Sequence, residues 1–186
     1  MTDRRHALAL LIASPWALPL ARAQDRPRPA LDVPYVPTPP EVVARMLEIA
    51  QVKKGDLLYD LGCGDGRIVV TAAREFGARG VGIDIDPARI REARENARKE
   101  GVGKLVQFRQ ADLFKSDFSR ATVVTLYLLP VINQKLRPQL WRQLKVGTRV
   151  VSHEFDMGDE WPPERTENLG GRRIHAWTIK PEHKRA

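Results

Sequence analysis

Three glycines stand in a short loop whose spacing suits the binding of a small polar ligand. The loop reads Asp60-Leu61-Gly62-Cys63-Gly64-Asp65-Gly66-Arg67 and follows a short apolar run. Glycine lets a backbone turn tightly and approach a ligand closely, because no Cβ is in the way. A helix that begins directly after such a loop presents its free N–H groups to the ligand. We therefore predict that Gly62, Gly64 and Gly66 form a ligand-binding turn; a glycine-rich turn without a ligand is the alternative.

The charge of this loop favours a cationic ligand group over a pyrophosphate. A dinucleotide fingerprint has the spacing G-x-G-x-x-G, but here Arg67 occupies the position of its last glycine. A carboxylate at Asp60 repels a pyrophosphate, whereas it can hold a positively charged amino group, directly or through water. The loop therefore favours a ligand with an amino-acid end over a nicotinamide dinucleotide.

Two further aspartates follow the next two predicted strands. Asp84 lies 24 residues beyond Asp60, near the position where α/β nucleotide-binding proteins place an acid that accepts both ribose hydroxyls. Asp112 can accept a hydrogen bond from an exocyclic amine such as that of adenine. Together with their neighbours Ile85 and Leu113, these acids predict a site for adenosine joined to an α-amino acid. The alternatives are a solvated loop acid at Asp84 and a simple turn cap at Asp112.

The elements that must position these residues alternate along the chain. Apolar and β-rich runs predict strands at residues 57–59, 80–85, 105–108, 122–128, 148–155 and 174–179, and helical spacing predicts helices at residues 39–50, 67–76, 87–100 and 131–144. Thr38 and Asp86 are predicted to cap the helices that follow them. Strands separated by helices indicate βαβ units, and therefore an α/β fold with a mostly parallel sheet and helices on both faces. Ligands of such sheets bind at the carboxyl ends of the strands, where the three acids are expected to meet.

The composition excludes several classes of protein. With 186 residues, of which 42% are hydrophobic, the chain is long enough for one domain with a buried core. The single cysteine, Cys63, rules out an intramolecular disulfide and a cysteine-based zinc cluster. His153, Glu154 and Asp156 are close in sequence but alternate in direction along a strand, so no metal site is predicted. The formal net charge of +8 admits nucleic acid or an anionic membrane surface as a partner, without establishing either.

The N-terminal residues are expected to lie outside the folded domain. Arg4 and Arg5 precede an apolar run and an Ala21-Arg22-Ala23 sequence, which is the layout of a cleaved secretory signal peptide over residues 1–23. The paired arginines also fit a twin-arginine signal; the alternatives are an uncleaved anchor and an amphipathic or core helix. Residues 24–40 are rich in proline, which indicates a linker that ends in a lid at the ligand site. Residues 41–181 form the predicted domain.

These motifs resemble a known family. The D-x-G-x-G-x-G loop, the acid after the second strand and the Ala-Asp after the third resemble class I S-adenosylmethionine-dependent methyltransferases over roughly residues 35–155. More narrowly, the Pro34–Pro39 segment, the D-L-G-C-G-D-G-R-I stretch from Asp60 and a Leu-Pro-bearing segment after the fourth strand are similar to small protein-lysine methyltransferases. Mitochondrial members of that group modify ATP synthase subunit c and the adenine nucleotide translocase. The resemblance implies a single-domain Rossmann-like fold, S-adenosylmethionine as cofactor, and a lid in which Tyr35 and Thr38 close over it.

The resemblance also implies methyl transfer to a protein lysine. Such a transfer needs the acceptor in line behind the methyl carbon, and a lysine must first lose its proton. Tyr127, at the mouth of the fourth strand, is the candidate catalytic residue; a packing aromatic is the alternative. The sequence there, Leu126-Tyr127-Leu128-Leu129-Pro130, differs from the Asn/Asp-Pro-Pro-aromatic tetrapeptide of enzymes that methylate base or glutamine amides. Recognition of DNA bases is therefore not expected.

The sequence leaves open the methyl acceptor, a non-catalytic function and the cellular location of the protein. Methylation of RNA or of a small molecule is compatible with the basic charge, and a non-catalytic protein that binds an adenosine-containing ligand is compatible with the motifs. The short chain leaves no room for a separate substrate domain, so a large or membrane-embedded partner can dock on an open face. The signal predicts an exported or periplasmic protein, but S-adenosylmethionine is made in the cytosol, so a cytoplasmic location is the alternative.

Overall fold

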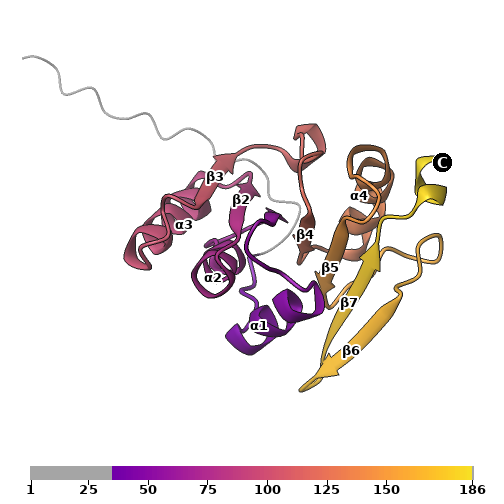
Figure 1. The fold of residues 1–186 in the computed structure, drawn as a ribbon, viewed down its shortest axis with the longest axis horizontal. Coiled ribbons are helices and arrows are strands. Elements are labelled where there is room, and N and C mark those ends of the chain that lie inside the picture. Colours follow the sequence, from indigo (N-terminus) through magenta and orange to yellow (C-terminus); the bar gives the residue numbers. More distant parts are fainter. Residues whose placement is uncertain (1–34, 186) are drawn as a thin grey trace, which may run out of the picture.

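The computed structural model describes residues 35–185, which fold around one sheet of seven strands (Figure 1). The export signal predicted for residues 1–23, and the linker up to residue 34, lie outside the described residues. Within residues 35–185, no helix combines the length and the apolar character that crossing a bilayer requires.

The sheet is mostly parallel, as predicted. Its strands are β1 (Leu57–Leu61), β2 (Arg79–Asp84), β3 (Val106–Gln110), β4 (Val123–Leu126), β5 (Arg149–His153), β6 (Arg165–Leu169) and β7 (Arg172–Thr178), and they lie in the order β3-β2-β1-β4-β5-β7-β6. The first five pair in parallel, while β7 runs antiparallel to both β5 and β6. Strand order reverses between β1 and β4, so a ligand crevice is expected at their carboxyl ends.

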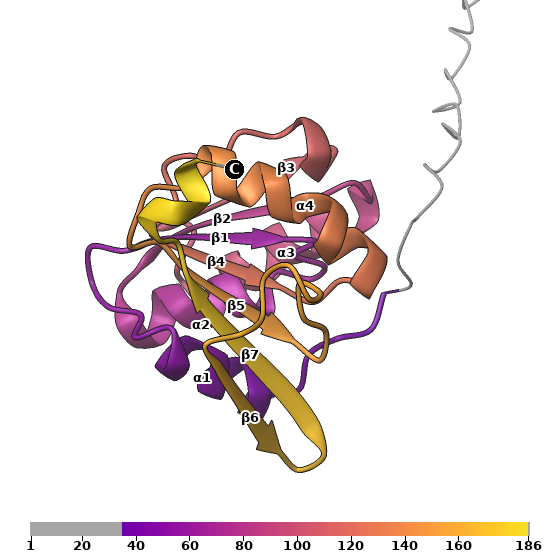
Figure 2. The ribbon, with the colours of Figure 1, turned by 90° about the vertical axis from the view of Figure 1, so that its right-hand side faces the viewer.

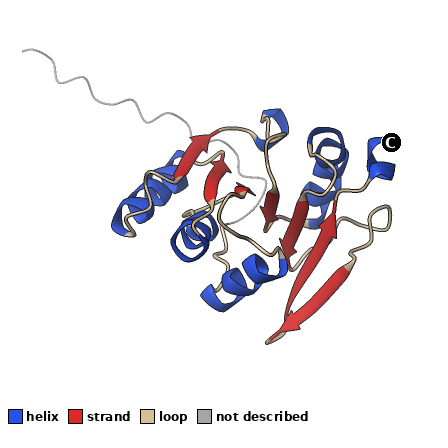
Figure 3. Ribbon diagram, in the orientation of Figure 1, coloured by secondary structure: helices blue, strands red, loops and turns tan. Residues whose placement is uncertain are grey.

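Helices cover both faces of the sheet (Figure 3). They are α1 (Pro40–Ile49), α2 (Arg67–Phe76), α3 (Pro87–Lys99) and α4 (Pro130–Gln143), with short 3-10 helices η1 (Leu113–Lys115) and η2 (Pro181–Lys184). The apolar sides of α1, α2 and α3 share one core cluster, to which Met46 and Val69 belong. The apolar side of α4 joins a second cluster on the opposite face, in which Leu136 and Leu140 are buried with Trp177. The prediction of an α/β sheet with helices on both faces is therefore confirmed.

One of the two predicted helix caps is present. The Asp86 carboxylate accepts a hydrogen bond from the N–H of Ala88 at 2.7 Å, which caps α3 as predicted. The prediction for Thr38 was wrong: Pro39 is the N-cap residue of α1, and no side chain caps that helix. Thr38 is buried, and its hydroxyl lies 3.2 Å from Nδ1 of His153 instead. The threonine therefore connects the segment before α1 to the end of β5.

The sheet also contains a strand that the sequence did not predict. β6 pairs with β7 in an antiparallel hairpin at the edge of the sheet, and Figure 2 shows this hairpin extending beyond the neighbouring strands. Its residues, Arg165-Thr166-Glu167-Asn168-Leu169, are largely exposed and show no apolar alternation. A strand without a buried face leaves no hydrophobic pattern in the sequence, which explains why it was missed.

Candidate cofactor site

A partly open cavity lies at the carboxyl ends of β1, β2 and β4, where the strand order reverses. Of the predicted site residues, all but one line this cavity: Tyr35, Thr38, Asp60, Gly62, Gly64, Asp84, Ile85, Asp112, Leu113 and Tyr127. Residues from five separate segments of the chain are thus brought together, as the strand-end argument predicted.

The glycine loop has the tight geometry that its sequence predicts. Gly62 and Gly64 have φ values of +82° and +52°, in the left-handed region that favours glycine. A Cβ on Gly62 would lie 2.6 Å from Leu128, and one on Gly64 would lie 2.5 Å from the ring of Tyr35. The loop therefore packs this closely against Leu128 and Tyr35 only because these two positions carry no side chain.

Gly66 is the one predicted site residue that does not line the cavity. Its φ is +76°, and a Cβ there would lie 2.6 Å from Phe108 and 2.8 Å from Ala93. The third glycine thus permits close packing of the loop against α3 and β3. It contributes to the site indirectly, since it fixes the start of α2.

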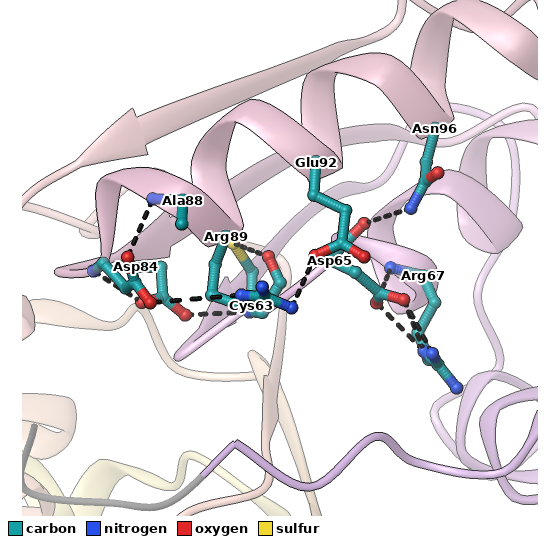
Figure 4. Close-up of polar contacts among 10 residues, drawn as sticks. Cys63, Asp65, Arg67, Asp84, Ala88, Arg89, Glu92 and Asn96 are labelled. Carbon is teal, nitrogen blue, oxygen red and sulfur yellow. Dashed lines mark hydrogen bonds and ion pairs between the residues drawn. The ribbon is translucent and has the colours of Figure 1, made fainter.

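The Asp84 carboxylate is held by backbone N–H groups at the end of β2. One oxygen accepts from the N–H of Gly64 at 2.8 Å, and the other accepts from the N–H of Asp86 at 2.9 Å. Figure 4 shows Asp84 beside the glycine loop, below the first turn of α3. This orientation fixes an acceptor at the cavity wall, which is what recognition of ribose hydroxyls requires.

Asp60 is a buried carboxylate that faces the same cavity. Its side chain is only 2% exposed, and one oxygen accepts a hydrogen bond from the hydroxyl of Thr125 at 2.8 Å. Burial raises the pKa of Asp60 to about 7, and the nearby carboxylates of Asp84 and Asp65 act in the same direction. A cationic ligand group next to Asp60 would relieve this unfavourable burial of charge, which fits the predicted amino-acid end of the ligand.

Asp112 both caps a turn and lines the cavity. Its carboxylate accepts from the N–H of Phe114 at 2.9 Å, so the capping role weighed as the alternative is present. The apolar side chains of Ile85 and Leu113 lie in the same wall. An aromatic ring system can be sandwiched by such apolar groups while a polar edge meets a carboxylate.

Two arginines, which the sequence did not single out, hold the segment Tyr35–Pro39 against the glycine loop. Arg67 donates from Nη1 to the backbone oxygen of Thr38 at 2.9 Å, and from Nη2 to Asp65 at 2.6 Å. The guanidinium of Arg89 lies 4.5 Å from the centre of the Tyr35 ring.

The carboxylate of Asp65 anchors this arrangement. Burial raises its pKa, but the hydrogen bonds from Arg67 outweigh burial and hold the pKa below its ordinary value. Asn96 of α3 donates to the backbone oxygen of Asp65 at 3.0 Å, and Figure 4 shows Asp65 between Asn96 and Arg67. Asp65 and Arg67 lie in the D-L-G-C-G-D-G-R-I stretch, and this was the one feature of the sequence that could have pointed to them as site residues.

Tyr127 follows β4 and lies in the cavity lining. Its half-buried side chain is accompanied in the cavity lining by Leu128, Ile132 and Phe114. The ring is 4.0 Å, centre to centre, from the ring of His153. Within the described residues, no group of three or more His, Cys, Asp and Glu side chains is arranged to hold a metal ion.

The strand order, the glycine loop and the three strand-end acids together define a class I S-adenosylmethionine-dependent methyltransferase. The donor set fits this cofactor: a buried carboxylate suits its amino group, the held carboxylate of Asp84 suits its ribose, and the wall of Ile85, Leu113 and Asp112 suits its adenine. A family model described as the ANTKMT methyltransferase domain matches residues 60–165. The chain belongs to this family and is a methyltransferase that uses S-adenosylmethionine.

Similar proteins support this assignment. A protein-lysine N-methyltransferase from Saccharolobus islandicus is 53% identical over 144 residues, which cover 77% of this chain and 89% of that protein. The adenine nucleotide translocase lysine N-methyltransferase of Mus musculus is 33% identical over 171 residues, covering 91% of this chain and 73% of that protein. A structure described as an RNA methyltransferase from Salinibacter ruber in complex with S-adenosyl-L-homocysteine is 62% identical, with a TM-score of 0.77. The match covers 78% of this chain and 95% of that one.

Proposed function

We propose that this enzyme methylates the side-chain amine of lysine in a protein. The observation that carries the proposal is the similarity to the Saccharolobus protein-lysine N-methyltransferase, which is 53% identical and matched over 89% of its length. The cavity lining near Tyr127 supports it, because Leu128, Ile132 and Phe114 offer apolar surface to the methylene stem of a lysine.

The residues divide between holding the cofactor and receiving the acceptor. S-adenosylmethionine supplies an electrophilic methyl group on a sulfonium. We propose that Asp60 binds its amino group, Asp84 its ribose and Asp112 its adenine, while Tyr35 and Thr38 cover it. Tyr127 is proposed to line the position where the acceptor nitrogen approaches. Because a free lysine has a pKa of about 10.4, its proton must pass to water at the open side before the nitrogen can attack.

Labelled methyl transfer tests the proposal directly. The purified full chain is incubated with methyl-labelled S-adenosylmethionine and cell extract, and the label is then separated into protein, RNA and small-molecule fractions. We expect label in protein, and mass spectrometry of the labelled peptides should locate it on the nitrogen of lysine. Label confined to RNA would overturn the lysine proposal and would agree with the description of the Salinibacter relative. Label confined to small molecules would also overturn it.

We also propose that the protein is exported, as the sequence of residues 1–23 indicates. N-terminal sequencing of the mature protein after cell fractionation tests this. Cleavage after Ala23 in an exported fraction is expected; an intact Met1 on a soluble cytosolic species would contradict it and favour the cytoplasmic alternative.

A further inference from the structure

The end of β5 carries a buried histidine that contacts two residues of the cavity lining, Thr38 and Tyr127. His153 is fully buried. Its Nδ1 lies 3.2 Å from the hydroxyl of Thr38, which belongs to the segment beside the glycine loop. The imidazole of His153 also packs against Tyr127: the two ring centres are 4.0 Å apart and the ring planes are inclined by 41°. One imidazole therefore connects the Tyr35–Pro39 segment to the residue at the proposed acceptor position.

The backbone after His153 is held in an unfavourable conformation. Glu154 has a φ of +68°, in the left-handed region that is unfavourable for a residue with a side chain. The N–H of Phe155 donates to the oxygen of His153 at 2.9 Å, so the chain reverses over a single residue. This turn places Phe155 with its ring centre 6.4 Å from that of Tyr127.

Contacts with β7 maintain this turn. The N–H of Glu154 donates to the oxygen of Arg173 at 2.7 Å, and its carboxylate pairs with the guanidinium of Arg173 at 3.2 Å. Backbone strain that the surrounding structure maintains is concentrated at functional sites in proteins. The turn therefore fixes His153 and Phe155 beside Tyr127.

His153 has one nitrogen that the described residues leave without a hydrogen bond. Nε2 is buried and has no partner within residues 35–185. A buried polar atom without a partner is destabilising, so a purely structural role would favour an apolar residue here. Burial lowers the pKa of His153 to about 4, with Arg172 acting in the same direction and Glu154 opposing it. The imidazole is therefore neutral at physiological pH and too weakly basic to deprotonate lysine.

We propose that His153 is a positioning residue of the methyl-acceptor site, which holds Thr38 and the ring of Tyr127 in their relative places. Through this contact, closure of the Tyr35–Pro39 segment and placement of the acceptor depend on each other. The inference rests on the proposed function in assigning the acceptor position to the end of the cavity near Tyr127.

Three variants separate this role from packing. His153→Phe keeps an aromatic ring against Tyr127 but loses Nδ1, Thr38→Val removes the hydroxyl partner, and His153→Asn keeps a polar group near the position of Nδ1. We expect kcat to fall about 10- to 100-fold in His153→Phe and in Thr38→Val, with a smaller loss in His153→Asn. Because one contact is removed in either case, the double variant His153→Phe/Thr38→Val should be no slower than the single variants.

Thr166→Val is the matched control. Thr166 lies on β6, outside the cavity lining, and its hydroxyl is 2.9 Å from Nδ1 of a second buried histidine, His175. Nε2 of His175 lies 3.3 Å from the backbone oxygen of Glu154, so this pair contacts the same turn. The same chemical change here leaves the contact between His153 and Thr38 in place, and it should leave kcat within twofold of the wild type. Thermal unfolding of every variant shows whether it folds; if His153→Phe does not, Thr38→Val and His153→Asn still carry the test.

The pH dependence of kcat/KM distinguishes positioning from proton transfer. A neutral His153 predicts that His153→Asn lowers the whole profile between pH 6 and 9 without moving its inflections. Loss of an inflection in that variant would show a titrating base and overturn the proposal. Full activity in His153→Phe, or single effects that multiply in the double variant, would overturn it as well.

The assay uses whichever acceptor the wild type labels in the fractionation experiment. If the wild type labels RNA, the lysine proposal has failed, while the same variants still decide whether His153 positions the acceptor. If the wild type labels lysine and His153→Phe is unaffected, only the positioning proposal has failed.

Discussion

Asp84 accepts a hydrogen bond from the backbone N–H of Gly64 at 2.8 Å, which joins the end of β2 to the glycine loop that follows β1. The two positions are 20 residues apart in sequence: Asp84 ends β2, and Gly64 lies in the loop after β1, the strand that pairs with β2 in parallel. The loop and the acid thus form one rigid unit, and a change at either is expected to affect the affinity for the cofactor.

We expect Asp84→Ala to raise the dissociation constant of S-adenosylmethionine about 10- to 100-fold. A hydrogen bond that involves a charged group contributes roughly 1.5–3 kcal/mol, and 1.4 kcal/mol corresponds to a factor of ten. Isothermal titration calorimetry measures the change. The control is Asp159→Ala, which alters an exposed acid outside the cavity lining and should bind as the wild type does. Unchanged affinity in Asp84→Ala would contradict the ribose assignment.

Cofactor affinity should increase between pH 6 and pH 8. The pKa of Asp60 is about 7, and only the ionised carboxylate attracts a cationic amino group. Because ionisation rises from about one tenth to about nine tenths over this range, the association constant should rise roughly tenfold. Asp60→Asn should bind more weakly and lose this pH dependence. The association constant is measured by calorimetry at each pH. If it rises equally with pH in the wild type and in Asp60→Asn, another group is responsible for the pH dependence.

The same carboxylate should reduce the stability of the cofactor-free enzyme at high pH. Folding raises the pKa of Asp60 from its ordinary 3.8 to about 7, so the folded state holds a proton that the unfolded state releases. The cost of ionising the buried group begins above pH 4 and is complete above pH 7, where it reaches up to about 4 kcal/mol. Urea unfolding at pH 8 should therefore find Asp60→Asn more stable than the wild type. The difference should disappear near pH 4.

Gly66→Ala should destabilise the fold more than Gly101→Ala. Both glycines have positive φ, +76° and +69°, but a Cβ meets Phe108 and Ala93 only at Gly66, whereas Gly101 has open space within 4 Å. We expect a loss of about 1 kcal/mol in the free energy of unfolding for Gly101→Ala and of roughly 2–5 kcal/mol for Gly66→Ala. Chemical denaturation measures both, and equal losses would show that Gly66 does not serve close packing.

Arg67→Lys should weaken cofactor binding, because lysine keeps the charge but cannot reach Asp65 and the Thr38 oxygen at once. We expect the dissociation constant of S-adenosylmethionine to rise about 3- to 10-fold, with faster release in stopped-flow experiments. Arg74→Lys is the matched control on the same helix, since Arg74 forms exposed ion pairs with Glu75 and Glu100. Similar effects in the two variants would contradict a specific role for Arg67.

The sequence predicted those helices and strands whose residue types are determined by local backbone geometry or by burial. Helix α2 begins at Arg67 and ends before Gly77, as predicted, because a glycine turn precedes it and a left-handed glycine follows it. The fully buried strand β4 and the largely buried strand β5 were found from their apolar runs. Their ends were predicted too far along the chain, because Tyr127 and Phe155 are apolar residues that leave the sheet.

The contacts between distant segments could not be predicted in the same way. Thr38 had the residue type of a helix cap, but the fold brings His153 to its hydroxyl across 115 positions of sequence. His153 itself was considered only as a metal ligand, since its contacts with Tyr127 and Thr38 depend on the pairing of strands. The role of Arg89 at the Tyr35 ring likewise depends on how α3 packs beside the loop.

The position of Tyr35 has a practical consequence for the design of experiments. Tyr35 lies in the cavity lining and is 41% exposed, so a group coupled to the chain at this residue would lie at the site. Near the carboxyl terminus, the ammonium of Lys184 in η2 contacts backbone oxygens of Trp141 and Leu144, at the end of α4. An affinity tag or a surface-coupling group therefore belongs at the carboxyl terminus, where it leaves the entrance free for a bulky acceptor.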